Sequence, residues 1–222
     1  MYTACIFDLD GTLTDTLESL TYSVNETLKE LGLSEITREQ CRAFVGNGAR
    51  VLIEKSLEAA GDSNMSRVEE AMQVYDRIFS ANCTYQVAPY EGIPELLQNL
   101  KERNIRLAVL SNKPHLQTKD VVRTFFGTDT FEWVQGQQEG IPRKPDPAAA
   151  CQIAERFHVP CSECIYVGDS EVDMMTGNAA GMHSVGVTWG FRSRDILEAY
   201  GARDLIDRPE EFLTIINEKG AE

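Results

Sequence analysis

The sequence lacks the features of a membrane or secreted protein. No apolar stretch approaches the roughly 20 residues that a membrane-spanning helix needs. The N-terminus carries neither the basic region nor the long apolar run of a signal peptide. Internal repeats and low-complexity segments are also missing from the sequence. We therefore expect a cytoplasmic protein with no membrane partner.

Basic residues are few for the size of the chain. Its 222 residues include 21 Lys and Arg against 35 Asp and Glu, which gives a formal net charge of -14. A nucleic acid is a polyanion that needs a basic face, so this balance argues against a nucleic-acid partner. The same negative field repels a small phosphate ester. Such a substrate would need local positive charge from a metal ion, a lysine or helix N-termini.

The six cysteines do not follow a recognisable metal-binding pattern. Cys161 and Cys164 form a single C-x-x-C, and no second pair lies at the spacing of a zinc site. A metal or redox site is the alternative interpretation of this pair. We expect reduced structural thiols, which are usual in a cytoplasmic protein.

The residues that are present are typical of a globular α/β protein. Apolar residues make up 42% of the chain and charged residues 25%. The length allows one domain, or a core that carries a smaller insertion. Short apolar runs that end at polar residues or glycine predict buried strands at 5–7, 106–110, 131–134, 165–167 and 184–187.

Helical segments separate these expected strands. One helix starts at Pro94, since proline is favoured at the first helical position, and another starts after Asp146 as its N-cap. Gly181 and Gly201 are typical of the residue that follows a helix. Alternating strands and helices predict an α/β fold with a doubly wound, mostly parallel sheet.

One segment breaks this alternation, because it has helical patterns and no convincing strand. Apolar residues recur at helical spacing from Leu17 to Leu31, and Thr37 with Gln40 fits a capping box. A second apolar stripe at helical spacing contains Val68, Met72, Tyr75 and Phe79. The simplest arrangement is a helical cap inserted after the first strand. We expect this cap at 17–83 and a Rossmann-like core formed by 1–16 and 84–222.

Two acidic residues directly follow the first expected strand. Asp8 and Asp10 flank Leu9, and side chains at i and i+2 on a strand end point the same way, so both carboxylates can face one site. Two close carboxylates repel each other and favour a shared proton or a cation. The alternative is an ordinary acidic turn at Asp10-Gly11.

Polar residues also follow the later strands. Ser111 can donate its hydroxyl to a phosphate oxygen, and Lys144, near a helix start, can supply a point charge. Asp169 follows the fourth expected strand, at 165–167, and Asp173 lies one helical turn further on. Each residue alone has an ordinary explanation. Together they favour a phosphate site with Mg²⁺, which prefers carboxylate and carbonyl oxygens.

These motifs together resemble those of the haloacid dehalogenase superfamily. The matching motifs are D-L-D-G-T at 8–12, Ser111-Asn112, Lys144-Pro145 and G-D-S-x-x-D at 168–173. The resemblance covers the whole chain, and the helical insertion looks like the first type of cap in that superfamily. Within the superfamily, V-G-N-G-A at 45–49 and T-W-G-F at 188–191 resemble the phosphoglycolate phosphatase group.

The resemblance implies a phosphatase that forms a phosphoryl intermediate on Asp8. Asp10 would be the general acid and base, and Ser111 with Lys144 would hold the transferring phosphoryl group. The expected phosphate-binding residues also include Gly11, Thr12 and Asn112.

The resemblance also implies a Mg²⁺ cofactor. Asp8, the backbone carbonyl of Asp10 and Asp169 would be its ligands, with Asp173 as support or as a further ligand. Asp10 also separates this chain from the dehalogenases of the superfamily, which lack the second aspartate because a leaving halide needs no proton. Phosphonate-cleaving members use a cap lysine. Cap lysines of this chain lie in no recognisable context and are interpreted as solvated: Lys29 and Lys55.

The cap carries one glycine-rich interruption that is a candidate for substrate recognition. Glycines let the backbone approach a substrate, and Gly46 with its neighbours Asn47 and Arg50 would read the part of the substrate beyond the phosphate. The alternative is a plain turn between two helices.

The leading hypothesis is a small-molecule phosphatase whose best candidate substrate is phosphoglycolate. A pyrophosphatase, a nucleotide or sugar-phosphate phosphatase and a β-phosphoglucomutase-type mutase are alternatives within the same chemistry. A remote alternative is a non-catalytic binding protein on the same fold, since fold alone does not fix function. The sequence makes no prediction of the oligomeric state.

Overall fold

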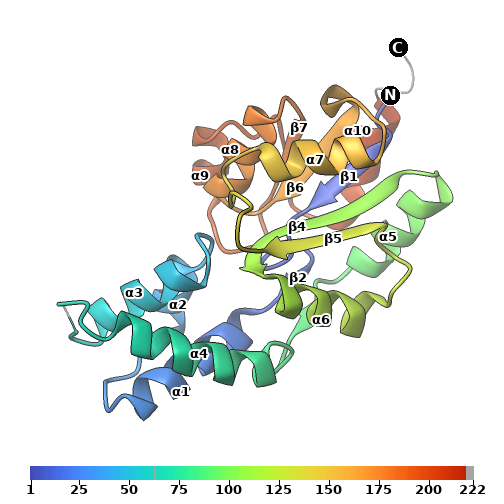
Figure 1. The fold of residues 1–222 in the computed structure, drawn as a ribbon. Coiled ribbons are helices and arrows are strands. Elements are labelled where there is room, and N and C mark those ends of the chain that lie inside the picture. The colour runs from blue at the N-terminus through green and yellow to red at the C-terminus, as the bar shows by residue number, and fades with distance from the viewer. Residues whose placement is uncertain (63, 219–222) are drawn as a thin grey trace.

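The computed structural model describes residues 1–62 and 64–218 and contains a six-stranded parallel sheet (Figure 1). Neighbouring strands pair in the same direction throughout this sheet. Across the sheet the order is β5 (Trp133–Gln137), β4 (Arg106–Pro114), β1 (Ala4–Phe7), β6 (Cys164–Gly168), β7 (His183–Val187) and β8 (Asp204–Ile206). This confirms the predicted fold class, a doubly wound α/β sheet with a helical insertion.

The central strand β1 shows why the sheet is covered on both faces. Cys5 and Phe7 belong to one apolar cluster, whereas Ala4 and Ile6 belong to another, because successive side chains of a strand point to opposite faces. On the Phe7 face lie α5 (Ile93–Glu102), α6 (His115–Phe126) and α10 (Phe212–Glu218). On the Ile6 face lie α7 (Ala148–Arg156), α8 (Glu171–Ala179) and α9 (Arg194–Ala199).

Three expected boundaries of the core elements were wrong by one to four residues. Strand β4 continues to Pro114, so Ser111 lies within the strand and not after it. Strand β5 starts at Trp133, because the buried Phe131 packs edge-on against Phe126 before the strand pairing begins. The N-cap position of α7 is Pro147, although the Asp146 carboxylate still accepts a hydrogen bond from a backbone N–H of the first turn.

The segment between β1 and α5 is helical, as expected. It contains α1 (Leu17–Glu30), α2 (Arg38–Phe44), α3 (Ala49–Ala59) and α4 (Val68–Asn82). The predicted capping box at Thr37 and Gln40 is present at the start of α2. Both apolar stripes face the interior of the protein, where these side chains are buried: Leu17, Leu20, Val24, Leu28, Val68, Tyr75 and Phe79.

The chain enters and leaves this helical region through one short antiparallel pair of strands. Strand β2 (Thr14–Asp15) pairs with β3 (Ala88–Pro89), so the outgoing and returning segments lie side by side. In Figure 1 the helices α1–α4 lie together beyond the end of the sheet. The exact division into a cap at 17–83 and a core at 1–16 and 84–222 stays a prediction.

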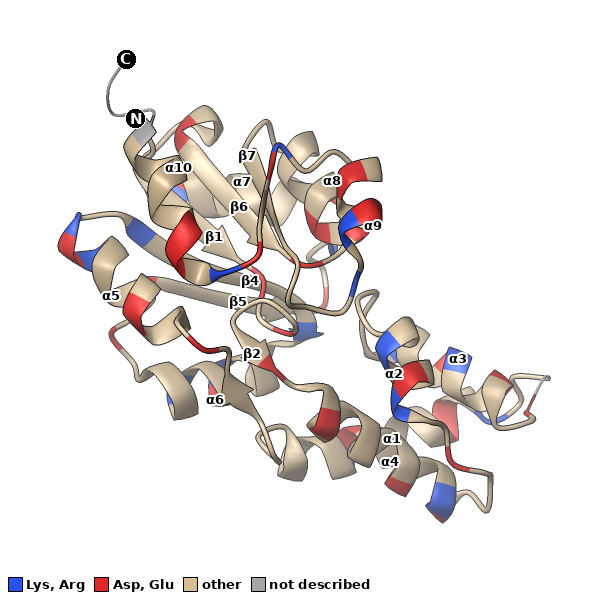
Figure 2. Ribbon diagram, turned by 180° about the vertical axis from the view of Figure 1, so that it is seen from behind, with Lys and Arg blue, Asp and Glu red and all other residues tan. Residues whose placement is uncertain are grey.

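Charges are distributed over both parts of the molecule. Figure 2 shows Lys and Arg mixed with Asp and Glu on the sheet-covering helices and on α1–α4 alike. Within residues 1–62 and 64–218, no helix combines the length and apolar character that a bilayer crossing requires.

Candidate active site

The predicted site residues come together at the carboxyl ends of the sheet strands. The strand order reverses at β1, since the chain passes from β1 to β4 and β5 on one side and to β6 on the other. Asp8 follows β1, Ser111 lies near the end of β4, and Asp169 follows β6. Open α/β sheets bind ligands at such a reversal point.

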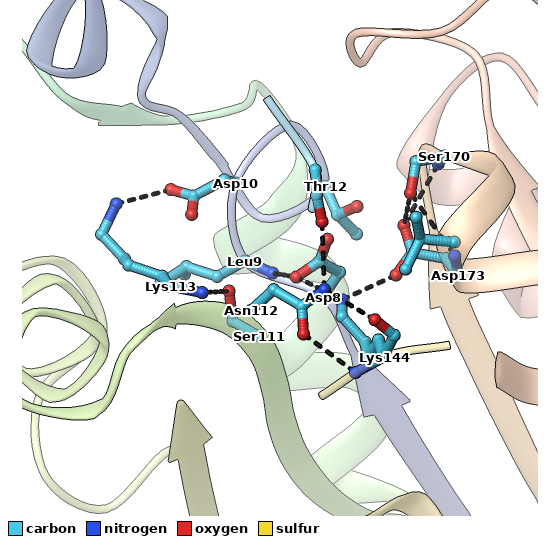
Figure 3. A network of polar contacts seen from close by, with 12 residues as sticks. Asp8, Leu9, Asp10, Thr12, Ser111, Asn112, Lys113, Lys144, Ser170 and Asp173 are labelled. Carbon is cyan, nitrogen blue, oxygen red and sulfur yellow. Dashed lines mark hydrogen bonds and ion pairs between the residues drawn. The ribbon is translucent and has the colours of Figure 1, made fainter. Parts of the chain in front are cut away.

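Lys144 ties two of these carboxylates together. Its Nζ lies 2.9 Å from Asp8 Oδ1 and 2.8 Å from Asp173 Oδ1. The Asp173 carboxylate also accepts hydrogen bonds from the backbone N–H and the hydroxyl of Ser170. Figure 3 shows Lys144 and Asp173 gathered on one side of Asp8. The Lys144 side chain is 2% exposed, so its charge acts on these carboxylates with little screening by water.

Asp169 is fixed by the loops around it. Its carboxylate accepts hydrogen bonds from the Thr12 hydroxyl at 3.0 Å and from the Phe191 backbone N–H at 2.7 Å. A Cβ built on Gly11 or on Gly190 would lie within 2.5 Å of an oxygen of that carboxylate. Both positions therefore need glycine, because any side chain would displace Asp169.

Burial of these acids together raises their pKa values. Burial raises the pKa of Asp8 well above its usual range, Asp173 raises it further, and Lys144 opposes the shift. Burial and the neighbouring Asp173 raise the pKa of Asp169 to about 7, against the hydrogen bonds that it accepts. Burial alone lowers the pKa of Lys144, but Asp173 and Asp8 outweigh it and hold that pKa well above its ordinary value. The raised pKa values of both aspartates and of Lys144 indicate that the cluster has too little positive charge to balance its carboxylates.

The carboxylates are also spaced for a cation. Among the described residues, Asp8, Asp169 and Asp173 each offer an oxygen, and these oxygens lie within 4.8 Å of one another. Hard oxygen ligands suit a divalent ion such as Mg²⁺. Two oxygens of Asp173 already accept hydrogen bonds from Lys144 and Ser170, which suits a supporting role better than direct ligation.

Asp10 lies on the other side of Asp8 (Figure 3). Its Oδ1 accepts a hydrogen bond of 2.8 Å from Lys113 Nζ, in an ion pair that is almost fully buried. Lys113 was not among the residues that the sequence singled out. The i, i+2 rule that joined Asp8 to Asp10 also joins Ser111 to Lys113, and it would have found this lysine had the strand been extended past Leu110.

Ser111 and Asn112 have different positions in the site. Ser111 lines the pocket, and its hydroxyl oxygen accepts a hydrogen bond from the Lys113 backbone N–H. The Asn112 side chain bonds the backbone N–H and carbonyl of Lys144 and the carbonyl of Gly46. Asn112 therefore positions Lys144 and the cap loop through its side-chain amide, which is fully engaged by the backbone.

The cap loop reaches the pocket, but its charged residue does not. Gly46 and Gly48 line the pocket, as does the start of α3. The Arg50 side chain lies on the surface and pairs with Glu54 and Glu69. The expectation that Arg50 faces the substrate was wrong, because its guanidinium pairs with Glu54 one turn further along α3 and with Glu69 in the first turn of α4, outside the pocket. Asn47 likewise is not among the pocket-lining residues, and its carbonyl accepts a hydrogen bond from Arg143.

The cavity between cap and core is small, with a volume of about 50 Å³. That is room for only a few water-sized groups. The cap contributes an apolar wall to this cavity: Leu20, Val45, Ala49, Leu52, Tyr75 and Phe79.

The comparison with protein families decides the assignment that the motifs suggested. The family of haloacid dehalogenase-like hydrolases matches residues 5–187, a range that includes all the charged residues of the site described above: Asp8, Asp10, Lys113, Lys144, Asp169 and Asp173. The chain belongs to this family.

Relatives of this hydrolase align with nearly the whole chain. A phosphoglycolate phosphatase from Colwellia psychrerythraea is 30% identical and covers 94% of each chain. A solved structure of a protein assigned as a phosphoglycolate phosphatase from Lactobacillus delbrueckii subsp. bulgaricus is 30% identical, with a TM-score of 0.87 and coverage of 95% of this chain and 96% of that one. A counterpart from Haemophilus somnus is 25% identical, with a TM-score of 0.90 and coverage of 97% and 98%.

The hydrolase also uses two arginines that no sequence signal identified. Arg42 of α2 donates to the backbone carbonyls of Gly190 and Phe191 in the core. Arg192 of the core donates in return to the carbonyls of Arg42 and Val45 in the cap. These side chains bind backbone atoms about 150 positions away, so neither a spacing nor a motif could reveal them. They hold the cap loop over the site.

Proposed function

We propose that the chain is a Mg²⁺-dependent phosphomonoester hydrolase that forms an aspartyl-phosphate on Asp8 and acts on a small phosphorylated metabolite. The observation that carries this proposal is the arrangement around Asp8, whose carboxylate lies 2.9 Å from the buried Lys144 ammonium at the reversal point of the sheet. A carboxylate beside a fixed cation can approach an anionic phosphate. Membership of a hydrolase family supports the same reaction class.

The raised pKa values support a metal at this site. Three buried carboxylates converge and Lys144 is the cation that contacts two of them, so a divalent ion would remove the remaining repulsion. Asp8, Asp169 and the backbone carbonyl of Asp10 would hold it, with Asp173 in support. Bound there, Mg²⁺ would supply positive charge that offsets the negative charge of the phosphoryl group.

In the first step Asp8 attacks phosphorus and the bond to the leaving oxygen breaks. Lys144 offsets the repulsion between the carboxylate and the phosphate, and the Ser111 hydroxyl donates to a phosphoryl oxygen. The backbone N–H of Leu9 donates to Asp8 Oδ1, and those of Gly11 and Thr12 donate within the turn, so these groups are engaged before a phosphate binds. Asp10 enters this step protonated on the oxygen that does not accept from Lys113, and it transfers that proton to the leaving alkoxide, which becomes the product alcohol.

In the second step the aspartyl-phosphate is hydrolysed. Asp10, now a carboxylate, takes a proton from a water molecule that attacks phosphorus. The bond from phosphorus to the Asp8 oxygen breaks, so inorganic phosphate leaves and Asp8 is restored. The cap loop, held by Arg42 and Arg192, limits the access of bulk water during this cycle.

The small cavity supports a small substrate. With room for only a few water-sized groups, a cavity of about 50 Å³ favours the smallest phosphomonoesters over nucleotides and sugar phosphates. The relatives named phosphoglycolate phosphatase are consistent with such a substrate, and phosphoglycolate is our first candidate.

A panel of phosphate esters tests this function. We expect Mg²⁺-dependent release of inorganic phosphate, with kcat/KM highest for phosphoglycolate-sized esters and lower for pyrophosphate, nucleotides and sugar phosphates. Product analysis with a sugar monophosphate separates a mutase, which would return the phosphoryl group to the sugar. No phosphate release from any ester with Mg²⁺ present would reject the proposal and favour a binding protein.

A further inference from the structure

Lys113 is a buried cation that the proposed reaction does not use. It lies near the end of β4, its side chain is 2% exposed, and it lines the pocket. Its Nζ donates one hydrogen bond, to Asp10 Oδ1, and sits 4.7 Å from the centre of the Phe79 ring in α4. A lysine is almost never buried unless it is paired. Lys113 meets this condition through Asp10, but its charge also faces the pocket, where the proposed reaction gives it no role.

The two buried lysines of the site differ in what surrounds them. Lys144 lies between the carboxylates of Asp8 and Asp173, on the side of Asp8 that is away from Asp10 (Figure 3). Lys113 has one carboxylate, that of Asp10, and an aromatic face. An ammonium has three N–H donors, so the described contacts use one of the three on Lys113. Lys113 can accept another anionic partner without losing Asp10.

The other cations near the pocket are engaged elsewhere. Arg192 lines the pocket, but its guanidinium donates to Glu171 and to the backbone carbonyls of Arg42 and Val45. Arg50 pairs with acids on the outer surface. Among the residues that the structure describes as lining the pocket, Lys113 is thus the cation with donors left over.

The position of Asp10 fixes where Lys113 acts. In the proposed reaction Asp10 protonates the oxygen that joins phosphorus to the leaving alcohol. Lys113 is one hydrogen bond beyond Asp10, so its Nζ lies at most roughly 8 Å from that oxygen, a distance made up of two hydrogen-bond lengths and the width of the carboxylate. A carboxylate one carbon away from the ester carbon spans part of this distance and can reach the ammonium.

Among the described residues that line the pocket from the cap, none has a charged side chain. Leu52, Tyr75 and Phe79 line this part of the pocket from the cap. A second negative charge on the substrate would be desolvated against these side chains, which is costly unless a cation meets it. Lys113 is placed to do so.

We propose, on the basis of the proposed function, that Lys113 is a specificity-determining residue that binds an anionic group on the leaving alcohol. The substrate class is then the small phosphomonoesters whose alcohol carries a carboxylate next to the ester carbon. The neutral ester of the same size loses this contact but keeps all contacts to the phosphoryl group.

The test compares phosphoglycolate with 2-hydroxyethyl phosphate, an uncharged counterpart of nearly equal size, on wild type and on Lys113→Met. Methionine keeps the length of the side chain and removes the charge. Loss of one charged hydrogen bond should lower the ratio of kcat/KM values, phosphoglycolate over the neutral ester, by roughly ten- to a hundredfold. Lys113→Arg should recover part of the ratio.

A matched control is available in the cap. Lys55 also lies over a phenylalanine ring, that of Phe44 at 5.9 Å, but does not line this pocket. The same change, Lys55→Met, should leave the ratio unaltered. An equal fall for both esters in Lys113→Met would overturn the proposal, because a residue that only positions Asp10 acts on every substrate alike.

Wild type alone provides a test that does not depend on the variant folding. Wild type should prefer phosphoglycolate to 2-hydroxyethyl phosphate by at least about tenfold in kcat/KM, and a preference for the neutral ester would overturn the assignment of Lys113. Phosphate release by wild type from any ester of the panel reports the proposed function separately. Its complete absence with every ester rejects that function, whereas activity with a ratio that Lys113→Met leaves unchanged rejects only the role of Lys113.

Discussion

The core wall of the pocket carries charged groups held by hydrogen bonds, whereas the cap wall is apolar. On the core side, the lining carboxylate of Asp8 contacts Lys144 and that of Asp169 accepts two hydrogen bonds, so each carboxylate has one defined position. On the cap side, residues such as Leu52 and Phe79 offer shape and no hydrogen bonds through their side chains. Under the proposed function this difference corresponds to a division of labour, in which the core acts on the phosphoryl group and the cap limits the size of the leaving group.

Removal of the metal should abolish the phosphatase activity that we assign to the core residues. We expect activity to require Mg²⁺ and to stop with excess chelator, because the carboxylates at Asp8 and Asp169 otherwise repel one another and the incoming phosphate. Full activity in chelated buffer would contradict the assignment. Calcium should bind but support little turnover, since its looser coordination misplaces the nucleophile.

The pH dependence of stability gives an independent readout of the same site. Burial raises the pKa of Asp169 from 3.8 to about 7, so between these values the folded metal-free protein holds a proton that the unfolded chain has lost. Its free energy of unfolding should therefore lose the contribution of Asp169 as the pH rises through this window. The increase in Tm on adding Mg²⁺ should grow over the same range. A Tm increase independent of pH would argue against a metal at Asp169.

Loss of Lys144 should have the next largest effect. Lys144→Ala removes the cation between Asp8 and Asp173, so kcat should fall by about 10²- to 10³-fold for every ester in the panel. The uniform loss is the point of the experiment, since the phosphoryl group is common to all substrates. A loss confined to one ester would place Lys144 in leaving-group recognition instead.

A change in the cap wall should alter selectivity and not the reaction. Leu52→Ala enlarges the pocket, and the ratio of kcat/KM values for a bulkier ester over a smaller one should rise by roughly tenfold. Leu57→Ala is the control, because Leu57 is buried in the same helix but does not line the pocket. If both variants changed the ratio equally, loss of packing and not pocket size would be the cause.

The smallest effect is expected at Arg50. Arg50→Ala breaks surface ion pairs with Glu54 and Glu69, outside the pocket, so all esters should keep their rates within about twofold. A selective loss of phosphoglycolate turnover would restore the specificity role that the sequence suggested.

The contrast between the two walls also explains what could be predicted from the sequence. The positions of Asp8 and Asp169 could be predicted because parallel strands bring their carboxyl ends to one edge, and that of Lys144 because a short motif marks it before α7. In the cap, the helices and the capping box at Thr37 were predicted from local periodicity. The direction of Arg50 was not, because it depends on how α3 packs, and packing leaves no local pattern in the sequence.

Contacts between residues far apart in the sequence could not be predicted either. Lys113 was missed because the strand was expected to end at Leu110, which removed the alternation that places it beside Ser111. Arg42 and Arg192 bind backbone carbonyls across the boundary between cap and core. Backbone atoms are the same at every position, so such contacts carry no residue-specific signal.

Turnover in the presence of hydroxylamine tests the central claim most directly, because hydroxylamine converts an aspartyl-phosphate to a hydroxamate. With Mg²⁺ and a phosphate ester, wild type should lose activity progressively, and mass spectrometry should find the hydroxamate on the peptide that contains Asp8. Enzyme without ester should keep both its activity and an unmodified Asp8. Asp8→Asn should fold but release no phosphate, since an amide is not a nucleophile. Steady phosphate release with hydroxylamine present and Asp8 unmodified would contradict the account.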